Sequence, residues 1–585
     1  HPPDPMKLRP IAAALALTLL AVPTLPAQTY DPGTGQSPLS LLAMPADGVA
    51  YYQVKERARE MFNAQRFAEA EPLLLQLARE YPRDPENWWL LGLAQTRLNK
   101  HAEAAVSYQK AGPLIGWDLQ YWNGYYMAAS RLAAGDRRGA LDALRWMINE
   151  RHGFWRGSLY DQPQWESLRN DPEFLELIGR PSTAGWTRNE GWVRDIDFLY
   201  NEVKRVNPDY RNTSFPAELT RRYEELKRNV PRLSDEEIFM GMNRMLAVLH
   251  QGHVALWSAR GNRYLPVRFY AFPEGLFIVE ADSAFRHLEG ARVVAFGPLP
   301  ADTALRRASE GRSVDGDMQH LWGVSTLAET AWLKGIGATQ RIDSVRLTVE
   351  LPGERARTVT LPTRDSARAG RQDRLVAPPR VAAPMFLRNL GQRFWHTAVP
   401  EHDAWYVQVN NLVSTPEETL SAYGRRLWTV LDTTTAKNLI LDLRHNNGGT
   451  TQLYPELLRT LIAYSRQPGN QVWVLIGRRT FSAAGNFVTD LERLTLPIFV
   501  GEASSECCNL YGDPVSVVLP WSGTRGELTA VKWQLSAPGD RRREISPELP
   551  VQLTARAYFA GEDPALDAIY RMIDSRRAAA PQASR

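Results

Sequence analysis

The sequence predicts a multidomain protein of the α plus α/β class, in which helical, β and α/β parts follow one another along the chain. The first observation is the length of 585 residues, since single domains typically hold about 100–200 residues. The second is a helical pattern that repeats from residue 51 onward. The third is a regular alternation of strand-like and helix-like segments after residue 404, which favours crossover connections and a largely parallel sheet.

Composition excludes several classes of protein. The chain carries 69 Lys and Arg against 65 Asp and Glu, a formal net charge of +4, and the basic residues are spread rather than clustered. We therefore expect no nucleic-acid partner, because the electrostatic footprint for one is missing from the sequence. Hydrophobic residues make up 44% of the chain, with 18 Trp and 21 Tyr, so the chain can bury cores and is not generally disordered.

The N-terminus predicts an export signal over residues 1–27. After Met6 come two basic residues, an apolar run and small residues up to Ala27, which is the order found in a cleaved signal peptide. His1–Pro5 look like a cloning remnant or a misread start, and residues 28–50 predict a linker. No later run is long and apolar enough for a membrane span, so we expect a periplasmic or secreted protein without a span after cleavage.

Residues 51–185 predict helical repeats followed by a cap. The recurring small and large apolar residues are Ala58, Ala70 and Leu74, then Gly92, Ala104 and Tyr108 at a spacing of 34, then Ala128, Ala140 and Leu144 after a two-residue slip. This spacing resembles the tetratricopeptide repeat, in which small residues let two antiparallel helices approach closely. Chance periodicity in ordinary helical hairpins is the alternative. Because such solenoids bind extended segments or helices, we expect a protein partner on the repeats.

Periodicity divides the remaining chain into five parts. Helical patterns, including a capping box formed by Ser234 and Glu237, give way to short β-branched runs. A charged, Pro-bearing stretch then leads into alternating strands and helices. The predicted parts are a helical segment over 186–258, a β module over 259–365, a linker over 366–400, an α/β part over 401–575 and a disordered tail over 576–585.

The two cysteines of the chain are neighbours, Cys507 and Cys508. Two cysteines are too few for a disulfide framework, and a bridge between adjacent residues closes a strained ring. We expect a pair of free or buried thiols that pack as small hydrophobes. A vicinal disulfide is the alternative.

Ser482 is the candidate nucleophile. It follows the apolar strand 472–477 and opens a helix, where backbone N–H groups and the helix dipole favour negative charge. A plain N-cap serine is the alternative. Gly448 and Gly449 end the neighbouring strand, and the amide of one of them, together with that of Ala483, predicts an oxyanion hole. A tight turn is the alternative for the glycine pair.

Five motifs, in their order along the chain, resemble the tail-specific and tricorn-type serine peptidases, also called the C-terminal-processing peptidases. They are LAVLHQGHVALW, NLILDLRHNNGG, RRTFSAAG, LPIFVGE and ISPELPVQL. The resemblance covers residues 190–575. It implies a PDZ-like β module over 259–365 and a crotonase-like α/β core over 401–575. It also implies hydrolysis of peptides or unfolded proteins through a serine acyl-enzyme, with no metal or other cofactor.

The resemblance also implies a base for the serine. One branch of the family uses a lysine downstream of the serine, at a position that holds Cys507 in this chain, and no lysine occurs from 438 to 531. The other branch uses a histidine from a Gly-His stretch, which here is His253, and imidazole titrates near neutrality as such a base must. An acidic residue before ISPELPV is expected to orient this histidine. Asp540 is the nearest, with Glu544 as the reserve.

Two departures from the family bear on activity. Gly485 stands where many relatives have Glu, and residues 503–509 replace a Gly-rich stretch. The leading hypothesis is an exported serine peptidase with Ser482 as nucleophile and His253 as general base. The alternative is a catalytically silent member that binds peptides or proteins through its repeats and its PDZ-like module. A third reading is an adaptor that delivers substrates to a separate protease.

Overall fold

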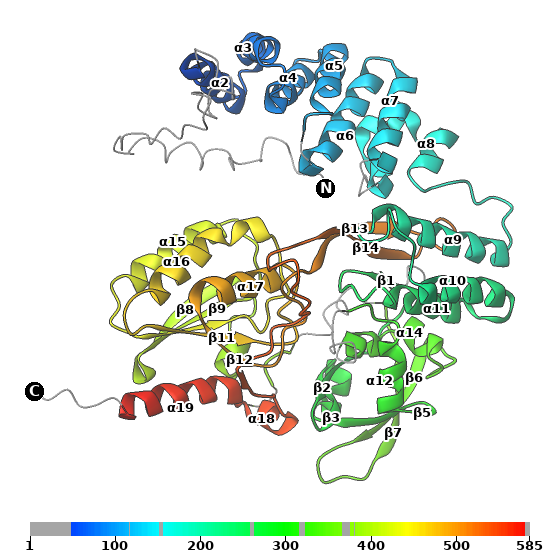
Figure 1. Cartoon of the computed structure of the whole chain (residues 1–585). Coiled ribbons are helices and arrows are strands. Elements are labelled where there is room, and N and C mark those ends of the chain that lie inside the picture. The colour runs from blue at the N-terminus through cyan, green and yellow to red at the C-terminus, as the bar shows by residue number, and fades with distance from the viewer. Residues whose placement is uncertain are drawn as a thin grey trace, which may run out of the picture. The chain divides into compact units, whose positions relative to one another are not determined.

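The chain divides into two compact units, with the boundary between Arg180 and Pro181 (Figure 1). The predicted export signal over 1–27 and the linker up to residue 47 lie outside the described residues. Within the described part of the chain, no helix is both long enough and apolar enough to cross a bilayer. The structure is a computed structural model that describes residues 48–115, 117–150, 156–257, 262–314, 322–365, 375–378 and 381–579.

The first unit is built from helices that pack against their neighbours in sequence. They are α2 (Gly48–Asn63), α3 (Phe67–Glu80), α4 (Pro85–Arg97), α5 (His101–Ala111), α6 (Trp117–Ala133) and α7 (Arg137–Arg145). The small residues that recur with the repeat spacing are fully buried, namely Ala58, Ala70, Ala104, Ala128 and Ala140. A Cβ atom on Gly92 would come within 2.7 Å of the Tyr108 ring. The spacing therefore marks contacts between helices, and the assignment to tetratricopeptide repeats stays a prediction.

Short turns end this unit. A π-helical turn (Trp146–Glu150), two 3₁₀ segments (Arg156–Asp161 and Pro163–Leu168) and α8 (Pro172–Leu177) follow α7. Trp165 and Phe174 are completely buried, and the ring of Trp165 meets that of Tyr125 edge to face at 5.7 Å between centroids. Because these large side chains join the core formed by α4 to α7, the turns cover the end of the helical array.

The second unit begins with three helices, α9 (Arg188–Val206), α10 (Ala217–Asn229) and α11 (Asp235–Ala247). Both α9 and α11 start with a capping box. The side chain of the first residue, a threonine or a serine, accepts the backbone N–H of a glutamate three residues later, and the glutamate side chain accepts the backbone N–H of that first residue. The box predicted for Ser234 and Glu237 is therefore present. The chain leaves α11 in a short turn and enters β1 (Ala255–Trp257), so this turn places His253.

An antiparallel sheet with strand order β2-β3-β4-β6-β7 follows, and β5 pairs with β4. Its strands are β2 (Val267–Phe272), β3 (Gly275–Ala281), β4 (Arg292–Phe296), β5 (Leu299–Pro300), β6 (Ser344–Glu350) and β7 (Arg357–Pro362). The helices α12 (Ala301–Ser309) and α14 (Thr330–Gly335) lie between β5 and β6 in sequence. Most of the strands fall where short β-branched runs predict them, and the PDZ-like assignment remains a prediction.

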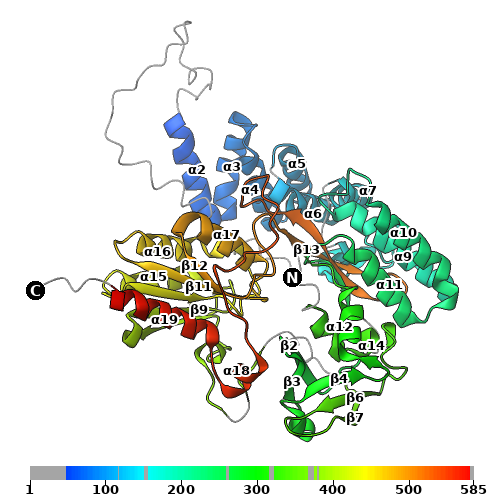
Figure 2. The ribbon, with the colours of Figure 1, turned by 60° about the horizontal axis from the view of Figure 1, so that its bottom comes forward.

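A largely parallel sheet with strand order β15-β12-β11-β10-β9-β8 forms the α/β part. Its strands are β8 (Phe394–Val399), β9 (Ala404–Val409), β10 (Asn438–Asp442), β11 (Gln471–Ile476), β12 (Ile498–Gly501) and β15 (Leu549–Pro550), and its helices are α15 (Leu420–Leu431), α16 (Pro455–Ser465), α17 (Ala483–Thr495), α18 (Ala555–Ala560) and α19 (Pro564–Ala579). All strand pairs are parallel except β8 with β9. The sheet has helices on both faces, α15 to α17 on one and α19 on the other (Figures 1 and 2).

Alternate residues of the central strands serve the two faces of this sheet. Leu439 and Leu441 pack with α15 to α17, whereas Ile440 between them packs with α19. Both faces are therefore buried, which explains why these strands read as continuous apolar runs rather than as an alternating pattern. The carboxyl ends of β10 and β11 carry the glycine loop and the Ser482 loop, and such ends are where ligands bind in open α/β sheets.

Three boundaries differ from the sequence prediction. The predicted linker over 366–400 contains β8, which pairs antiparallel with β9 along the edge of the sheet. The predicted α/β part over 401–575 is interrupted, because β13 (Tyr511–Val518) and β14 (Arg525–Lys532) leave it to form a three-stranded sheet with β1. The predicted disordered tail over 576–585 starts too early, since α19 continues to Ala579. The pairing of β1 with β14 joins segments far apart in sequence, which local composition cannot report.

Gly424 of α15 gives a test of how closely α15 and α16 pack. A Cβ atom at this position would lie 2.8 Å from the backbone nitrogen of Leu457, and a backbone atom cannot move aside. We expect Gly424→Ala to lower the free energy of unfolding by about 1–3 kcal/mol through overpacking, measured from the midpoint of urea unfolding. The control is Gly391→Ala, where a Cβ meets nothing within 4 Å and the change is expected within about 0.5 kcal/mol. Equal midpoints for the two variants would contradict the prediction.

Candidate active site

Ser482 and His253 are brought together from two separate segments of the second unit. Ser482 lies at the start of α17, directly after the β11 loop, and His253 lies in the turn between α11 and β1. The His253 Nε2 atom is 2.9 Å from the Ser482 Oγ atom, although the residues are 229 positions apart. The imidazole ring also stacks on the ring of Phe481, with 4.5 Å between centroids. The two residues that the sequence analysis selected therefore form a hydrogen-bonded pair.

The backbone of Ser482 is in an unusual conformation. Its φ is 57° and its ψ is −128°, a region that residues with a side chain rarely adopt and that persists where the surroundings enforce it. The Ser482 side chain makes no capping hydrogen bond to α17, so the N-cap alternative does not describe what the hydroxyl does. The sharp turn instead presents the hydroxyl to His253.

Glu506 is the acid that faces His253. Its Oε1 atom is 3.5 Å from His253 Nδ1, and its Oε2 atom accepts a hydrogen bond of 3.1 Å from the backbone N–H of Ser482. The carboxylate is 1% exposed. One buried side chain thus contacts both members of the pair, and it lies in the 503–509 stretch that departs from the family pattern.

Two glycines make room for Glu506. A Cβ atom on Gly252 would overlap Glu506 Oε1, and a Cβ atom on Gly485 would lie 2.8 Å from the Glu506 carbonyl oxygen. Gly485 is the other departure from the family pattern. The two departures are therefore neighbours in space and adapt the site to an acid at position 506.

Sequence reasoning assigned the orienting acid to Asp540, and the contacts do not place it there. The Asp540 carboxylate accepts hydrogen bonds from Ser536 Oγ at 2.7 Å and from Arg542. These bonds hold the pKa of Asp540 well below its ordinary range. The acid at ion-pair distance from His253 is Glu506 rather than Asp540 or the reserve candidate Glu544. The signal that could have found it is local, because Glu506 is the single charged residue of the 503–509 stretch, where an isolated charge among small residues suggests a buried, partnered group.

The electrostatic surroundings raise the pKa of His253. Burial alone lowers the pKa of an imidazole, but the Glu506 carboxylate, the Tyr511 backbone carbonyl and the Glu527 carboxylate together outweigh it. The carboxyl groups of Asp513 and Glu527 also interact electrostatically with the His253 ring. Burial raises the pKa of each carboxyl, and the interaction with His253 opposes that rise. The site is therefore built to stabilise a protonated imidazole, the state that forms when His253 accepts a proton from a serine hydroxyl.

The glycine loop packs directly against the Ser482 turn. Gly448 has φ of 105°, and a Cβ atom on it would lie 2.7 Å from Ser482 Cβ. Gly449 has φ of 142°, and its Cβ would overlap the Leu412 carbonyl oxygen. The loop is tied to the 412 segment, since Leu412 N–H donates to Gly448 O and Thr450 N–H donates to Leu412 O. Only glycine fits these two positions, because both the φ value and the space exclude a side chain.

The backbone amides of this loop differ in what they contact. The Gly448 N–H donates to the Asn446 side chain at 3.0 Å, so the predicted role of Gly448 as an oxyanion donor is not supported and its contribution is close approach. For the N–H groups of Gly449 and Ala483, the described residues offer no acceptor. Both residues line a cavity of about 380 Å³ of empty space together with Ser482. These two amides are the candidates for an oxyanion hole.

A second, larger cavity lies on the Phe481 side of the site. It holds about 1440 Å³ of empty space, and its wall combines aromatic side chains with charged ones. The aromatic residues of the wall include Trp257, Tyr264, Phe269, Trp322, Trp332 and Phe481. Ser482 itself lines the small cavity, and the neighbouring Phe481 lines the larger one, whose wall also contains the charged residues Arg312, Glu329, Arg478 and Arg479.

No protein-family model matches the sequence, and no curated protein matches it. Among solved structures, mature CPAF complexed with lactacystin is 13% identical with a TM-score of 0.50, covering 66% of this chain and 98% of its own. A photosystem II D1 C-terminal processing protease is 13% identical with a TM-score of 0.32, covering 63% and 98%. The tricorn protease is 14% identical with a TM-score of 0.32, covering 66% and 37%.

At these identities a likeness to a solved structure concerns the fold alone. The fold of this chain is similar to that of CPAF over 66% of its length. Solved structures of a C-terminal processing protease and of the tricorn protease are also among the matches. The likeness to CPAF therefore bears on the fold, and the residues of the site carry the argument for an activity.

Proposed function

We propose that this chain is a serine peptidase that hydrolyses peptide bonds through an acyl-enzyme on Ser482. The observation that carries the proposal is the line of contacts from Ser482 Oγ through the His253 ring to Glu506, at 2.9 Å and 3.5 Å. A nucleophile, a base within hydrogen-bond reach and a group behind the base are the parts that acyl transfer needs. The fold likeness to CPAF agrees with this proposal.

The first half of the reaction uses His253 as general base. Nε2 accepts the hydroxyl proton while Oγ attacks the carbonyl carbon of the substrate, and Glu506 stabilises the imidazolium that results. The negative charge that develops on the carbonyl oxygen is received by the N–H groups of Gly449 and Ala483. Collapse of the tetrahedral intermediate breaks the C–N bond, and the proton on Nε2 goes to the leaving amine. A water molecule then repeats the sequence on the acyl-enzyme, which releases the acid and restores Ser482.

Glu506 has a second role in this mechanism. Because Oε2 also accepts the Ser482 N–H, the acid holds the nucleophile's backbone as well as the base. This contact directs the N–H of Ser482 away from the substrate and leaves the next amide, that of Ala483, for the oxyanion. The mechanism requires no metal or other cofactor.

The substrate is proposed to be an extended peptide or an unfolded protein. Ser482 lines the small cavity and Phe481 lines the larger one, so a substrate bound at Ser482 has a space close by, and the aromatic part of the larger cavity suits a bulky apolar side chain. The repeats of the first unit are proposed to recruit a protein partner. The signal-like N-terminus supports a periplasmic or secreted location.

The silent-scaffold alternative depended on the two departures from the family pattern. Gly485 and the 503–509 stretch now have a role, since the first makes room for Glu506 and the second supplies it. With that role assigned, the departures favour an adapted active site over a lost one.

Covalent labelling tests the nucleophile. A fluorophosphonate probe is expected to label the wild-type protein and to fail on Ser482→Ala, because the probe requires an activated serine. His253→Ala should also abolish labelling, since it removes the base. The control is Ser465→Ala at the end of α16, whose hydroxyl donates to the Ile462 carbonyl, and it should label normally. Labelling that persists in Ser482→Ala would remove Ser482 from the mechanism.

A pair of isosteric variants tests which acid assists His253. Glu506→Gln is expected to lower kcat/KM by up to about 10⁴-fold, the loss that follows when the acid of a serine triad is neutralised. Asp540→Asn should leave kcat/KM close to that of the wild type, because Asp540 contacts Ser536 and Arg542 instead. A larger loss in Asp540→Asn than in Glu506→Gln would restore the assignment made from the sequence.

The pH profile tests the electrostatics. Since only neutral imidazole accepts a proton and the pKa of His253 is raised, kcat/KM should rise with pH through a midpoint above about 6.5. Glu506→Gln should move this midpoint to lower pH. Glu527→Gln should move it in the same direction by less, because Glu527 influences the ring less than Glu506 does. A midpoint that stays constant in Glu506→Gln would separate this acid from the base.

A further inference from the structure

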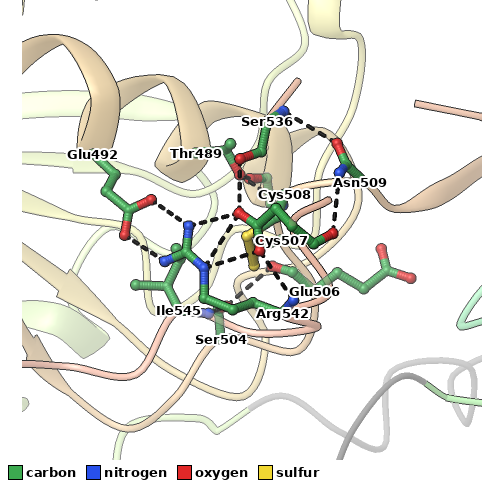
Figure 3. The surroundings of a disulfide bond; sticks show 12 residues. Thr489, Glu492, Ser504, Glu506, Cys507, Cys508, Asn509, Ser536, Arg542 and Ile545 are labelled. Carbon is green, nitrogen blue, oxygen red and sulfur yellow. Dashed lines mark hydrogen bonds and ion pairs between the residues drawn. A yellow bond between two sulfur atoms is a disulfide. The ribbon is translucent and has the colours of Figure 1, made fainter. Parts of the chain in front are cut away.

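A disulfide bond directly follows the acid of the site. The sulfur atoms of Cys507 and Cys508 are joined at 2.04 Å, so the expectation of two free thiols is wrong and the vicinal-disulfide alternative holds. Both cysteines are buried, at 2% and 0% exposure. Figure 3 shows Glu506 next to this disulfide, with its side chain pointing away from the sulfur atoms. The proposed mechanism makes no use of the bond.

The disulfide restricts the backbone beside Glu506. A bond between neighbouring cysteines closes a small ring that contains the peptide bond between them, so the torsions of both residues lose most of their freedom. Cys508 has φ of 70°, a region that residues with a Cβ atom rarely occupy. The ring therefore holds a turn that an unbridged Cys-Cys pair would tend to leave.

The turn is attached to the helix that Ser482 begins. The Cys508 N–H donates to Thr489 Oγ1 at 2.8 Å, and the Thr489 hydroxyl donates to the Gly485 carbonyl at 2.7 Å. Thr489 on α17 thus links Gly485, which follows Ser482 in the helix, to Cys508, which follows Glu506 in the turn. A movement of the Cys507–Cys508 turn would therefore also displace the Glu506 carbonyl, which lies against Gly485.

The other side of Glu506 is held as well. Ser504 Oγ donates to the Glu506 carbonyl at 3.0 Å and accepts the Ile545 N–H at 2.8 Å (Figure 3). The backbone at 506 is therefore held between Ser504 and the disulfide. Because the Glu506 side chain is enclosed, its position follows from the backbone. A separation of 3.5 Å from His253 Nδ1 leaves little room for displacement.

We propose that the Cys507–Cys508 disulfide is a positioning device for catalysis, which holds Glu506 in contact with His253 and with the Ser482 backbone. This inference rests on the proposed peptidase function. The cysteines touch neither the substrate nor the reacting atoms and act through Glu506. Cys507, which stands at the position of the lysine used by one branch of the family, thus helps to hold the acid that supports His253.

The test removes the bond in two ways. In Cys507→Ser/Cys508→Ser the ring is absent and side-chain volume is nearly unchanged. The second way is to treat the folded wild-type protein with a dithiol, which reduces the bond. The dithiol gives two electrons, the S–S bond breaks, each cysteine sulfur takes a proton and the reductant closes its own disulfide. Alkylation followed by mass spectrometry reports the fraction reduced, and kcat/KM is compared with that fraction.

The double variant Cys507→Ser/Cys508→Ser, called the serine variant below, is expected to lose about 10–100-fold in kcat/KM. A displacement of a catalytic group, here Glu506, by about 1 Å produces a loss of this size. The acidic midpoint of its pH profile should fall, as in Glu506→Gln. In the Glu506→Gln background the same cysteine substitutions should add little, because residues that act through one group are not additive. Cys507→Ser/Cys508→Gly, which tolerates the positive φ, should recover part of the loss. Reduced wild type should behave as the serine variant does.

Several results would overturn the inference. Unchanged kcat/KM and an unchanged acidic midpoint in the folded serine variant or in fully reduced wild type would do so, even if the melting temperature fell, since that describes a purely structural bond. Equal losses in the wild-type and Glu506→Gln backgrounds would show that the bond does not act through Glu506. Failure of the peptidase proposal is distinguishable, because it appears in unmodified wild type as absent hydrolysis and absent labelling of Ser482.

Discussion

The buried carboxylate of Glu506 is the contact on which the arrangement of the site depends. A carboxyl group with 1% exposure requires polar partners inside the protein, because burial of a polar group without them is unfavourable. Its partners are the Ser482 amide on one oxygen and the His253 ring beside the other. That requirement explains why Gly252 and Gly485 lack side chains, why the pKa of His253 is raised and why the 503–509 stretch is anchored closely.

The convergence of distant segments on this carboxylate follows from strand pairing. The β1 strand, two residues after His253, pairs antiparallel with β14, with Ala255 opposite Glu527, and β14 pairs with β13. Since β13 follows the Glu506 turn directly, this small sheet connects the turn that carries the base to the loop that carries the acid. The nucleophile arrives separately, on the strand-to-helix turn of the parallel sheet. Three parts of the chain thus meet at one point, each held by its own hydrogen-bonded framework.

The two departures from the family pattern and the cysteine pair form one structural adaptation. No lysine occurs from 438 to 531, and the proposed base, His253, reaches Ser482 from the turn after α11. In the proposed reaction this buried histidine becomes protonated, and a counter-charge favours that state. Glu506 supplies that charge, Gly485 gives it space, and the disulfide occupies the position next to it.

Much of the fold and part of the site follow from the sequence alone. Apolar periodicity is a local property, so it located the helices of the first unit and the strands buried on both faces of the parallel sheet, and the spacing of Ser234 and Glu237 located the capping box. Short motifs singled out Ser482 and His253, which lie within hydrogen-bond distance of each other. Tertiary structure decided the place of β8, the pairing of β13 and β14 with β1, the bond between Cys507 and Cys508, and the choice of Glu506 over Asp540. The pairing of β14 with β1 and the choice of Glu506 depend on which distant backbone segments pack together, and neither spacing nor composition within one segment carries that information. The bond between the neighbouring cysteines depends instead on the conformation of one turn, in which Cys508 has a positive φ and bonds to Thr489 of α17.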